Sequence, residues 1–284
     1  MKLCRYGAPG EEKPGIVDGQ GTLHDLSAVL DDIEADRLDP DKLKALAAAI
    51  NVETLPVVPG QVRLGVPFTG TPKYIGIGLN YSDHAIEANL PIPDEPVIFN
   101  KATSSICGPY DDIIQPKNST MLDWECELAV VIGKRAQHVS EDESLSYVAG
   151  YCVANDVSER AFQFQSSQWK KGKSCDTFGP LGPWLVTTDE IPDPQNLSMW
   201  LDVNGERMQE GNTRTMIFPV RRIISYVSEY MTLVPGDIIA TGTPPGVGMG
   251  KRPRPVYLEP GDIVTLGIDG LGEQRQRVVP FRPQ

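Results

Sequence analysis

The sequence predicts a β-rich α+β protein, and three observations support this prediction. Short apolar runs typical of strands recur along the chain and are separated by its 27 glycines and 25 prolines. Helical patterns are few, and they do not alternate with strands as a doubly wound parallel sheet requires. Because apolar runs lie between the turns, the high glycine and proline content indicates tight turns rather than disorder.

The first part of the chain contains one clear helix. Residues 1–54 alternate short apolar runs with turns, and Asp39 then precedes a leucine- and alanine-rich stretch at 40–50. An aspartate directly before such a stretch is typical of a helix cap, so we expect one short helix there. Residues 55–72 are rich in proline and glycine, which is typical of a connector.

The rest of the chain carries most of the expected strands. Strand-like runs occur at residues 96–100, 128–132, 147–154, 236–240 and 262–266. Helical patterns occur at 81–89, 141–147, 157–166 and 219–230. We therefore divide the chain into a small N-terminal domain with its connector, 1–66, and a catalytic domain, 67–284.

Composition excludes several classes of partner. The formal net charge is −12, which disfavours nucleic acid because its phosphates need a basic surface. No apolar run approaches the roughly 20 residues that span a bilayer, and residues 1–7 lack the apolar core of a signal peptide. We expect a cytoplasmic protein with no membrane partner. An anionic small molecule would need a local cation, which a bound metal ion would supply.

A metal site built from sulfur or imidazole is not expected. The chain has five cysteines, no pair of which forms a Cys-x-x-Cys, and only three histidines. An odd number of dispersed cysteines indicates reduced thiols that pack as small apolar groups. A zinc site with three histidine ligands would consume every histidine of the chain.

Three carboxylates offer a different kind of metal site. Glu125 and Glu127 precede the apolar run 128–132, and alternation along a strand places both on one face. Asp156 follows the apolar run 147–154, after Asn155. The alternative for Glu125 and Glu127 is a solvated strand end. The alternative for Asp156 is a helix cap or turn residue. As a cluster, carboxylates without sulfur or imidazole would select Mg²⁺, Mn²⁺ or Ca²⁺.

Five segments carry a resemblance to a known family. In chain order they are Gly78–His84 (GLNYSDH), Trp124–Glu127 (WECE), Asn155–Arg160 (NDVSER), Gly172–Pro180 (GKSCDTFGP) and Thr241–Gly248 (TGTPPGVG). This order resembles the fumarylacetoacetate hydrolase superfamily over about residues 72–284. The resemblance implies a mixed β-sandwich roll with a small N-terminal domain and assembly as a homodimer. It also implies that Glu125, Glu127 and Asp156 bind Mg²⁺ or Mn²⁺.

The resemblance assigns three catalytic residues. His84 and Glu87 lie three apart and would share one face of a helix, where the carboxylate could help the imidazole take a proton from water. Without the family, an exposed His–Glu pair is the alternative. Lys173 matches a family lysine that faces the substrate, where it could stabilise an oxyanion.

Four further residues are expected to bind substrate. Arg160 and Gln163 follow Asp156 by four and seven residues, on roughly one helical face. By resemblance they hold the carboxylate or carbonyl of the substrate, and Thr243 hydrogen-bonds its carboxylate. Lys101 is also typical of the family, although its role does not follow from the sequence.

The implied reaction is hydrolysis of a carbon–carbon bond in a 2,4-diketo acid, which releases pyruvate. The N-terminal segment resembles bacterial 2,4-diketo-3-deoxy-L-rhamnonate hydrolases, so we expect a sugar acid. No unassigned arginine occurs in the five segments, which disfavours a substrate with a second carboxylate. The alternatives are an oxaloacetate decarboxylase or acylpyruvase, a 2-hydroxyhepta-2,4-diene-1,7-dioate isomerase, and a catalytically inactive binding protein.

Overall fold

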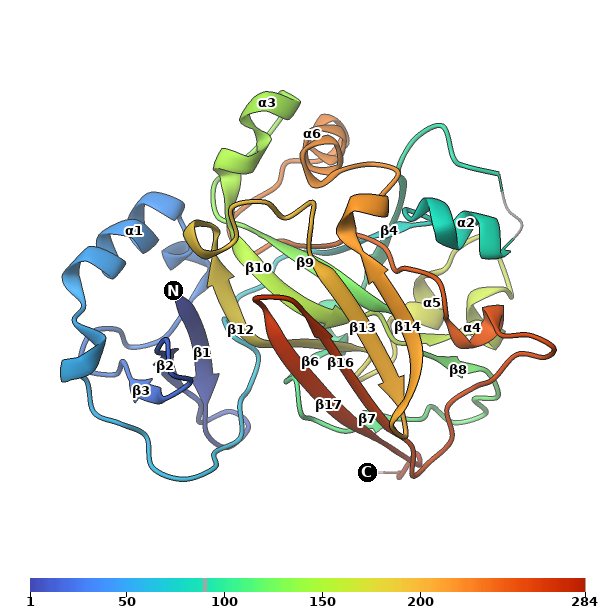
Figure 1. The fold of residues 1–284 in the computed structure, drawn as a ribbon, viewed down its shortest axis with the longest axis horizontal. Helices are drawn as coiled ribbons and strands as arrows, with labels where there is room; N and C mark the ends of the chain where they lie inside the picture. The colour runs from blue at the N-terminus through green and yellow to red at the C-terminus, as the bar shows by residue number, and fades with distance from the viewer. Residues whose placement is uncertain (89–90, 284) are drawn as a thin grey trace.

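The computed structural model describes residues 1–88 and 91–283, apart from the side chains of His84 and Ala88. Two β-sheets, a two-stranded ribbon and short helices make up the fold (Figure 1). This arrangement confirms the strand-rich α+β prediction. No helix within the described ranges is both long enough and apolar enough to cross a membrane.

The larger sheet runs through the middle of the molecule. Its path consists of β3 (Leu23–Asp25), β2 (Lys13–Val17), β1 (Lys2–Tyr6), β12 (Gly179–Thr187), β10 (Val148–Asn155), β9 (Cys126–Ile132), β15 (Ile238–Ala240), β4 (Tyr74–Gly78) and β5 (Val97–Lys101). The short strand β6 (Ile106–Cys107) pairs with β12 outside this path. β15 is parallel to β4 and antiparallel to β9, so the sheet is mixed. Each run predicted as a strand overlaps one, either here or in the smaller sheet.

The central strands are buried on both faces. Every residue of β9 and of β10 is buried, which explains their almost continuous apolar sequence. Leu128 and Val130 belong to the main core, whereas Ala129 and Val131 belong to a second core beneath the N-terminal segment. Because side chains alternate along a strand, Glu127 faces the same side as Ala129 and Val131.

The smaller sheet covers the opposite face of the central strands. Its path consists of β14 (Glu206–Asn212), β13 (Ser198–Val203), β16 (Ile263–Ile268), β17 (Gly272–Val279) and β7 (Ile113–Ile114). Leu201 of β13 and Leu266 of β16 are fully buried in the same core cluster as Leu128. The two sheets therefore pack face to face around an apolar layer.

The N-terminal segment continues the larger sheet. β1 pairs antiparallel with β12, with Lys2 opposite Val186. The predicted helix is confirmed as α1 (Pro40–Ala49), and the Asp39 carboxylate accepts a hydrogen bond from the Asp41 N–H at 2.9 Å. No helix or strand occurs between residues 55 and 72, as expected for a connector. The division at residue 66 stays a prediction.

The remaining helices are short. They are α2 (Ser82–Ala88), α3 (Glu141–Ser144), α4 (Arg160–Gln163), α5 (Lys170–Lys173) and α6 (Val220–Tyr230). The expected helix at 157–166 is wrong over most of its length, since β11 (Ser158–Glu159) pairs with β8 (Leu122–Asp123). The Glu159 side chain then caps the single turn of α4 by accepting from the Ala161 N–H at 3.1 Å.

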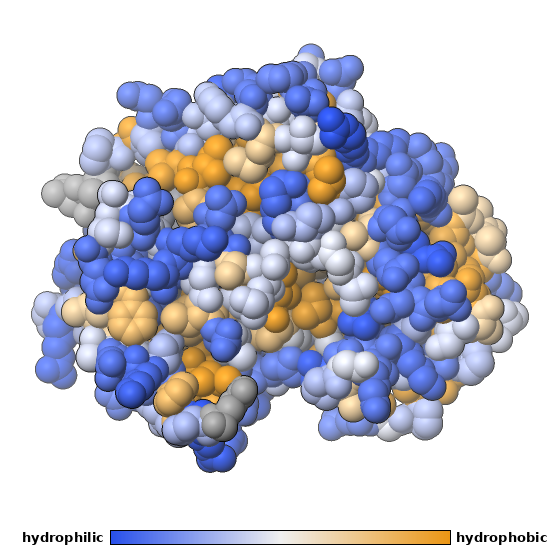
Figure 2. All heavy atoms as spheres, turned by 180° about the vertical axis from the view of Figure 1, so that it is seen from behind, coloured by the Kyte–Doolittle hydropathy of each residue, from blue (hydrophilic) through white to orange (hydrophobic). Residues whose placement is uncertain are grey.

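The face of the molecule opposite to that in Figure 1 is mostly hydrophilic, with several apolar patches (Figure 2).

Candidate active site

Strand pairing brings Glu125, Glu127 and Asp156 together. Glu127 lies opposite Ala154 in the register of β9 and β10, and Asp156 follows β10 directly. The Asp156 N–H donates to the Glu125 carbonyl oxygen at 2.9 Å, which holds the two chain segments in place. One carboxylate oxygen from each acidic residue lies within 4.8 Å of the others, and all three residues are buried.

Buried cations neutralise two of these carboxylates. The Lys173 Nζ donates to Glu125 Oε2 at 2.8 Å and to Asp156 Oδ2 at 2.6 Å. The Arg160 Nη2 lies 2.6 Å from Glu125 Oε1. On the other side of Asp156, the Lys101 Nζ bonds to Oδ1. Lys101, Arg160 and Lys173 are themselves buried, so these ion pairs are shielded from solvent.

Glu127 differs from its neighbours because none of the described lysines and arginines pairs with it. Its side chain is 2% exposed, and its Oε2 accepts a hydrogen bond from the Gly242 N–H at 2.8 Å. Within the described ranges, no lysine or arginine lies at ion-pair distance from it. Burial raises the pKa of Glu127 well above its ordinary value, and the charges of Asp156 and Glu125 raise it further.

The paired groups keep their charges. Burial alone would raise the pKa of Glu125, but Lys173 and Arg160 lower it below its ordinary value. Burial likewise opposes the charge of Lys173, but Asp156 and Glu125 raise its pKa above the ordinary lysine value. The pKa of Lys101 is lowered because burial outweighs its attraction to Asp156. At neutral pH the centre of the site is therefore an ionised carboxylate bridged by an ammonium group.

These three carboxylates fit a divalent cation. They supply only hard oxygen donors, which suits Mg²⁺ or Mn²⁺ better than zinc. Glu127 supports this fit most directly, since a buried carboxylate without a counter-charge is costly unless a cation compensates it. The same cation would also lower the repulsion that raises the Glu127 pKa.

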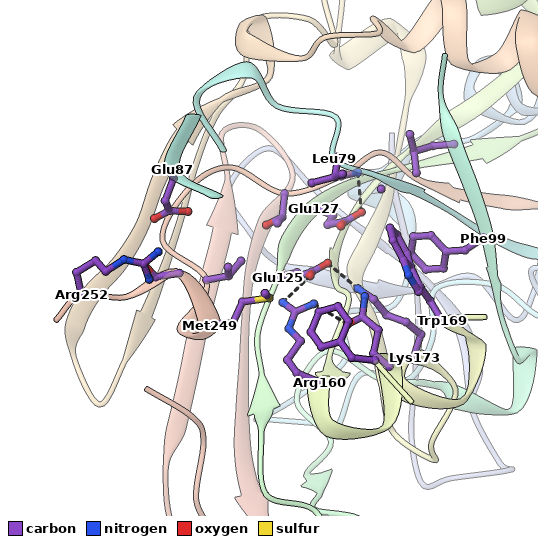
Figure 3. Close-up of a pocket in the computed structure, with 18 residues that line it drawn as sticks. Leu79, Glu87, Phe99, Glu125, Glu127, Arg160, Trp169, Lys173, Met249 and Arg252 are labelled. Carbon is purple, nitrogen blue, oxygen red and sulfur yellow. Dashed lines mark hydrogen bonds and ion pairs between the residues drawn. The ribbon is translucent and has the colours of Figure 1, made fainter. Parts of the chain in front are cut away.

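A cavity of about 360 Å³ opens onto this cluster (Figure 3). Its polar lining includes Glu125, Glu127, Arg160, Gln163, Lys173 and Thr243. Its apolar lining includes Leu79, Phe99, Phe164, Trp169, Val247 and Met249. Glu87 and Arg252 complete the wall on the side away from Phe99 and Trp169 in this view. A small organic anion fits such a pocket, with few polar groups on one side and apolar walls around them.

One side of the cavity is an aromatic wall. The Phe99 and Trp169 ring centroids lie 5.6 Å apart, and the Lys173 Nζ lies 5.1 Å from the Phe99 centroid. Trp169 packs against the backbone at Gly78, where an added Cβ would lie 2.5 Å from the indole ring. Glycine at this position therefore allows the close approach of Trp169.

Two of the residues expected to bind substrate make other contacts. The Thr243 hydroxyl donates to the Cys126 carbonyl oxygen at 2.9 Å and accepts from the Gln209 Nε2 at 2.8 Å. Its single proton is therefore directed at the main chain. Lys101 bonds to Asp156 and does not line the cavity. A supporting role for Lys101 fits this placement better than direct substrate contact.

Arg160 and Gln163 do line the cavity, as expected. The Arg160 Nη1 donates to Gln163 Oε1 at 3.0 Å, so the amide is held by the guanidinium group. The Gln163 Nε2 is a donor that this contact leaves available to a ligand. Their roles in substrate binding stay predictions.

Helix α2 lies against the glycine-rich segment at 241–248. The Glu87 carboxylate accepts from the Gly246 N–H at 3.0 Å and 3.2 Å, and Glu87 lines the cavity. The side chain of His84 lies outside the described residues, so the predicted His84–Glu87 pair stays a prediction. The backbone of His84 does lie in α2, one helical turn before Glu87.

Asp123 is a buried residue that the sequence did not single out. Its Oδ1 accepts from the Gly248 N–H at 2.7 Å, and its Oδ2 accepts from the Met249 N–H at 3.0 Å and from Arg160 Nε at 2.9 Å. It therefore joins the cavity-lining segment around Gly248 to the arginine that pairs with Glu125. In the sequence, only the position of Asp123 beside Trp124 indicated that it could matter, and that position does not indicate this role.

Arg252 corrects an argument made from the sequence. The five family-like segments contain no unassigned arginine, and this absence disfavoured a second substrate carboxylate. Arg252 lies just beyond the last segment, and the fold places it in the cavity wall.

Comparison with known proteins gives a consistent result. Residues 73–279 match the model of the fumarylacetoacetate (FAA) hydrolase C-terminal family. A Burkholderia multivorans protein that carries only a general hydrolase name is 59% identical over 277 residues, 97% of this chain and 98% of the relative.

Two solved structures share the whole fold. A fumarylacetoacetate hydrolase from Exiguobacterium antarcticum is 35% identical with a TM-score of 0.89, covering 99% of this chain and 100% of the other. A maleylpyruvate hydrolase from Sphingobium sp. SYK-6 is 32% identical with a TM-score of 0.82, again over 99% and 100%.

Proposed function

The chain belongs to the fumarylacetoacetate hydrolase family, and from this premise we propose that it is a divalent-metal-dependent hydrolase of a 2,4-diketo acid. Water would add to the C4 carbonyl, the C3–C4 bond would break, and pyruvate and a carboxylic acid would leave. The observation that supports this proposal most is the buried Glu127 carboxylate, which lines the cavity beside Glu125 and Asp156 and pairs with no lysine or arginine of the described ranges.

The metal would be Mg²⁺ or Mn²⁺, held by Glu125, Glu127 and Asp156. When bound, it would act as a Lewis acid that stabilises negative charge developing on the substrate. Lys173 and Arg160 would add positive charge on the same side of the cavity. Because both are already held by Glu125, they would need little reorganisation to face a second anion.

Residues of helix α2 would activate the water. Glu87 lines the cavity, and His84 precedes it by one helical turn. An imidazole oriented by a carboxylate can take a proton from water at neutral pH. Lys173 would stabilise the oxyanion that develops at C4, since its Nζ lies in the cavity wall with its charge maintained.

The narrower substrate expectation concerns the tail beyond C4. In 2,4-diketo-3-deoxy-L-rhamnonate this tail carries a hydroxyl and a methyl group, and hydrolysis would release lactate. The walls away from the carboxylates are mostly apolar, with Val247 and Met249 among them. Such walls suit the methyl group and offer the hydroxyl few partners. Homodimer assembly and a cytoplasmic location also stay predictions.

A substrate panel tests this function. The purified protein would be incubated with acetylpyruvate, the sugar acid and oxaloacetate, each with Mg²⁺, with Mn²⁺ and with EDTA. We expect metal-dependent release of pyruvate together with the acid formed from the tail. Cleavage that persists after exhaustive chelation would contradict the metal role.

The same panel, extended by a 2-hydroxy-dienedioate, separates the other reactions of this family. Faster loss of carbon dioxide from oxaloacetate than cleavage of any diketo acid would indicate a decarboxylase. Conversion of a 2-hydroxy-dienedioate without loss of carbon would indicate an isomerase. Binding without any turnover would indicate an inactive binding protein.

A further inference from the structure

Gln209 is a buried polar residue that the proposed reaction does not use. It lies on β14, at one edge of the smaller sheet (Figure 1), and it is fully buried although the other residues of that strand are exposed or half-buried. A buried amide is costly unless its donor and acceptor groups are hydrogen-bonded. Its Oε1 accepts from the Cys126 N–H at 2.9 Å. Its Nε2 donates to the Thr243 Oγ1 and to the Pro244 carbonyl oxygen, both at 2.8 Å.

The main chain of Cys126 lies between the two glutamates of the acidic cluster. β15 pairs with β9 farther along the strand, so side chains bond to the main chain of Cys126 instead. Gln209 accepts from its N–H, and the Thr243 hydroxyl donates to its carbonyl oxygen at 2.9 Å. Because Glu125 and Glu127 adjoin Cys126 in the chain, the orientation of these two groups governs the directions in which both carboxylates extend.

Close packing between β14 and the glycine-rich segment allows this arrangement. A Cβ added to Gly211 of β14 would lie 2.4 Å from the Cβ of Pro244. A Cβ added to Gly246 would lie 2.0 Å from the Met208 carbonyl oxygen. Glycine at these two positions therefore lets the segment approach β14, and this approach places Gln209 within hydrogen-bond distance of it.

We propose that Gln209 and Thr243 hold the main chain of Cys126 in place and thereby set the spacing of Glu125 and Glu127 for a divalent cation. This inference rests on the proposed function, because it concerns the metal site of that reaction. Both residues act through the glutamates and are therefore positioning residues. Removing a residue that orients a metal ligand typically weakens metal affinity by roughly 10–100-fold. If Thr243 instead contacted only the substrate, its loss would raise KM and leave metal affinity unchanged.

Calorimetric titration of the metal-free protein with Mg²⁺, in the absence of substrate, tests this proposal. Gln209→Met removes the amide but keeps the length of the side chain, and Thr243→Val removes the hydroxyl but keeps its shape. Gln195→Met is the matched control. Gln195 also accepts from a main-chain N–H, that of Val220 at 2.9 Å, and donates to a main-chain carbonyl oxygen, that of Thr213 at 2.7 Å, but it does not line the cavity. We expect the Kd for Mg²⁺ to rise by roughly 10–100-fold in each of the first two variants and to stay unchanged in the control.

The double variant strengthens the test. Because Gln209 and Thr243 hold the same main-chain groups and bond to each other, the double variant should lose less affinity than the product of the two separate losses. Wild-type affinity for Mg²⁺ in both single variants would overturn the proposal, as would an equal loss in Gln195→Met. A raised KM in Thr243→Val without any change in Mg²⁺ affinity would assign Thr243 to the substrate instead. If Gln209→Met does not fold, Thr243→Val decides between these outcomes.

A separate measurement distinguishes failure of this inference from failure of the proposed function. If the wild type binds neither Mg²⁺ nor Mn²⁺, the proposed function fails. Crystal structures of the metal-free wild type and of the variants then decide whether Gln209 and Thr243 position the glutamates. Displaced Glu125 and Glu127 carboxylates in the variants would support the positioning role, and carboxylates at their wild-type positions would contradict it.

Discussion

The two sides of the cavity are built in different ways. On the inner side, Glu125 and Glu127 precede or lie in a central strand, and Lys173 is 2% exposed with its charge held between two carboxylates. On the outer side, Phe164 is 58% exposed, and Arg252 is exposed on a loop, where its Nη1 donates to main-chain carbonyl oxygens. The inner side is buried and its side chains hold one another in place, whereas the outer side is open to solvent.

Because of this difference, we expect catalysis to depend on the inner side of the cavity and substrate choice to depend on the outer side. A change on the inner side leaves a buried charge or donor without its partner, which is costly both for folding and for catalysis. A change on the outer side exposes a group that water can solvate, so it should alter substrate choice with little effect on folding. Four variants test this contrast.

The largest effect is expected at Glu127. Glu127→Gln keeps the shape and the acceptor for the Gly242 N–H but removes the charge. Loss of a metal ligand should lower pyruvate release on the order of 10⁴-fold, since metal catalysis contributes several kcal/mol. Without metal, the variant should melt at the same temperature or higher, because the uncompensated charge opposes folding.

Thermal melting with and without Mg²⁺ provides the control for Glu127→Gln. Added Mg²⁺ should raise the melting temperature of the wild type and leave that of the variant unchanged. If both proteins gain the same stability from Mg²⁺, Glu127 is not a ligand, and the contrast between the two sides loses its main support.

The second effect concerns water activation. His84→Ala should slow hydrolysis of the diketo acid by roughly 10²–10⁴-fold, the range expected for loss of a general base. Any decarboxylation of oxaloacetate should suffer less, because that reaction needs no deprotonated water. Pyruvate release from both substrates would be compared with a coupled assay, and equal losses would show that His84 only positions α2.

A third variant measures how far the inner side depends on its ion pairs. Asp123→Asn removes the charge that faces Arg160 Nε and two main-chain N–H groups. Leaving a buried arginine with one carboxylate fewer should lower the free energy of unfolding by about 3 kcal/mol. Urea denaturation would measure this loss.

Asp202→Asn is the matched control for Asp123→Asn. Its partner Arg207 is half-exposed, and a surface ion pair of this kind contributes about 0–1 kcal/mol. Similar losses in the two variants would mean that burial does not set the cost, and the contrast would then not hold for stability.

The smallest effect is expected at Phe164, on the outer side. Its ring is 58% exposed although it lines the cavity. Phe164→Ala should change the free energy of unfolding by no more than about 0.5 kcal/mol, as is usual for an exposed position. Its effect should appear in KM values for substrates with different tails. A large loss of stability would show that this loop packs more firmly than its exposure indicates.

Much of the fold followed from local patterns in the sequence. The apolar runs predicted as strands overlap strands, and Asp39 caps the predicted helix α1. These features could be predicted because hydrophobic periodicity and capping depend on residues close together in the chain. The helix expected at 157–166 failed because pairing of β11 with β8, a contact between distant segments, replaced the local preference.

The sequence by itself determined the family, the strands and the three acidic residues of the candidate site, since these lie in short ordered motifs. Three further features followed only from the packed structure: among the described residues Glu127 pairs with no lysine or arginine, Thr243 directs its hydroxyl at the main chain, and Arg252 lies in the cavity wall. The physical reason is that charge compensation and exposure depend on contacts between segments far apart in the chain. The partners of a carboxylate or a guanidinium group exist only after the strands and loops that carry them have packed together.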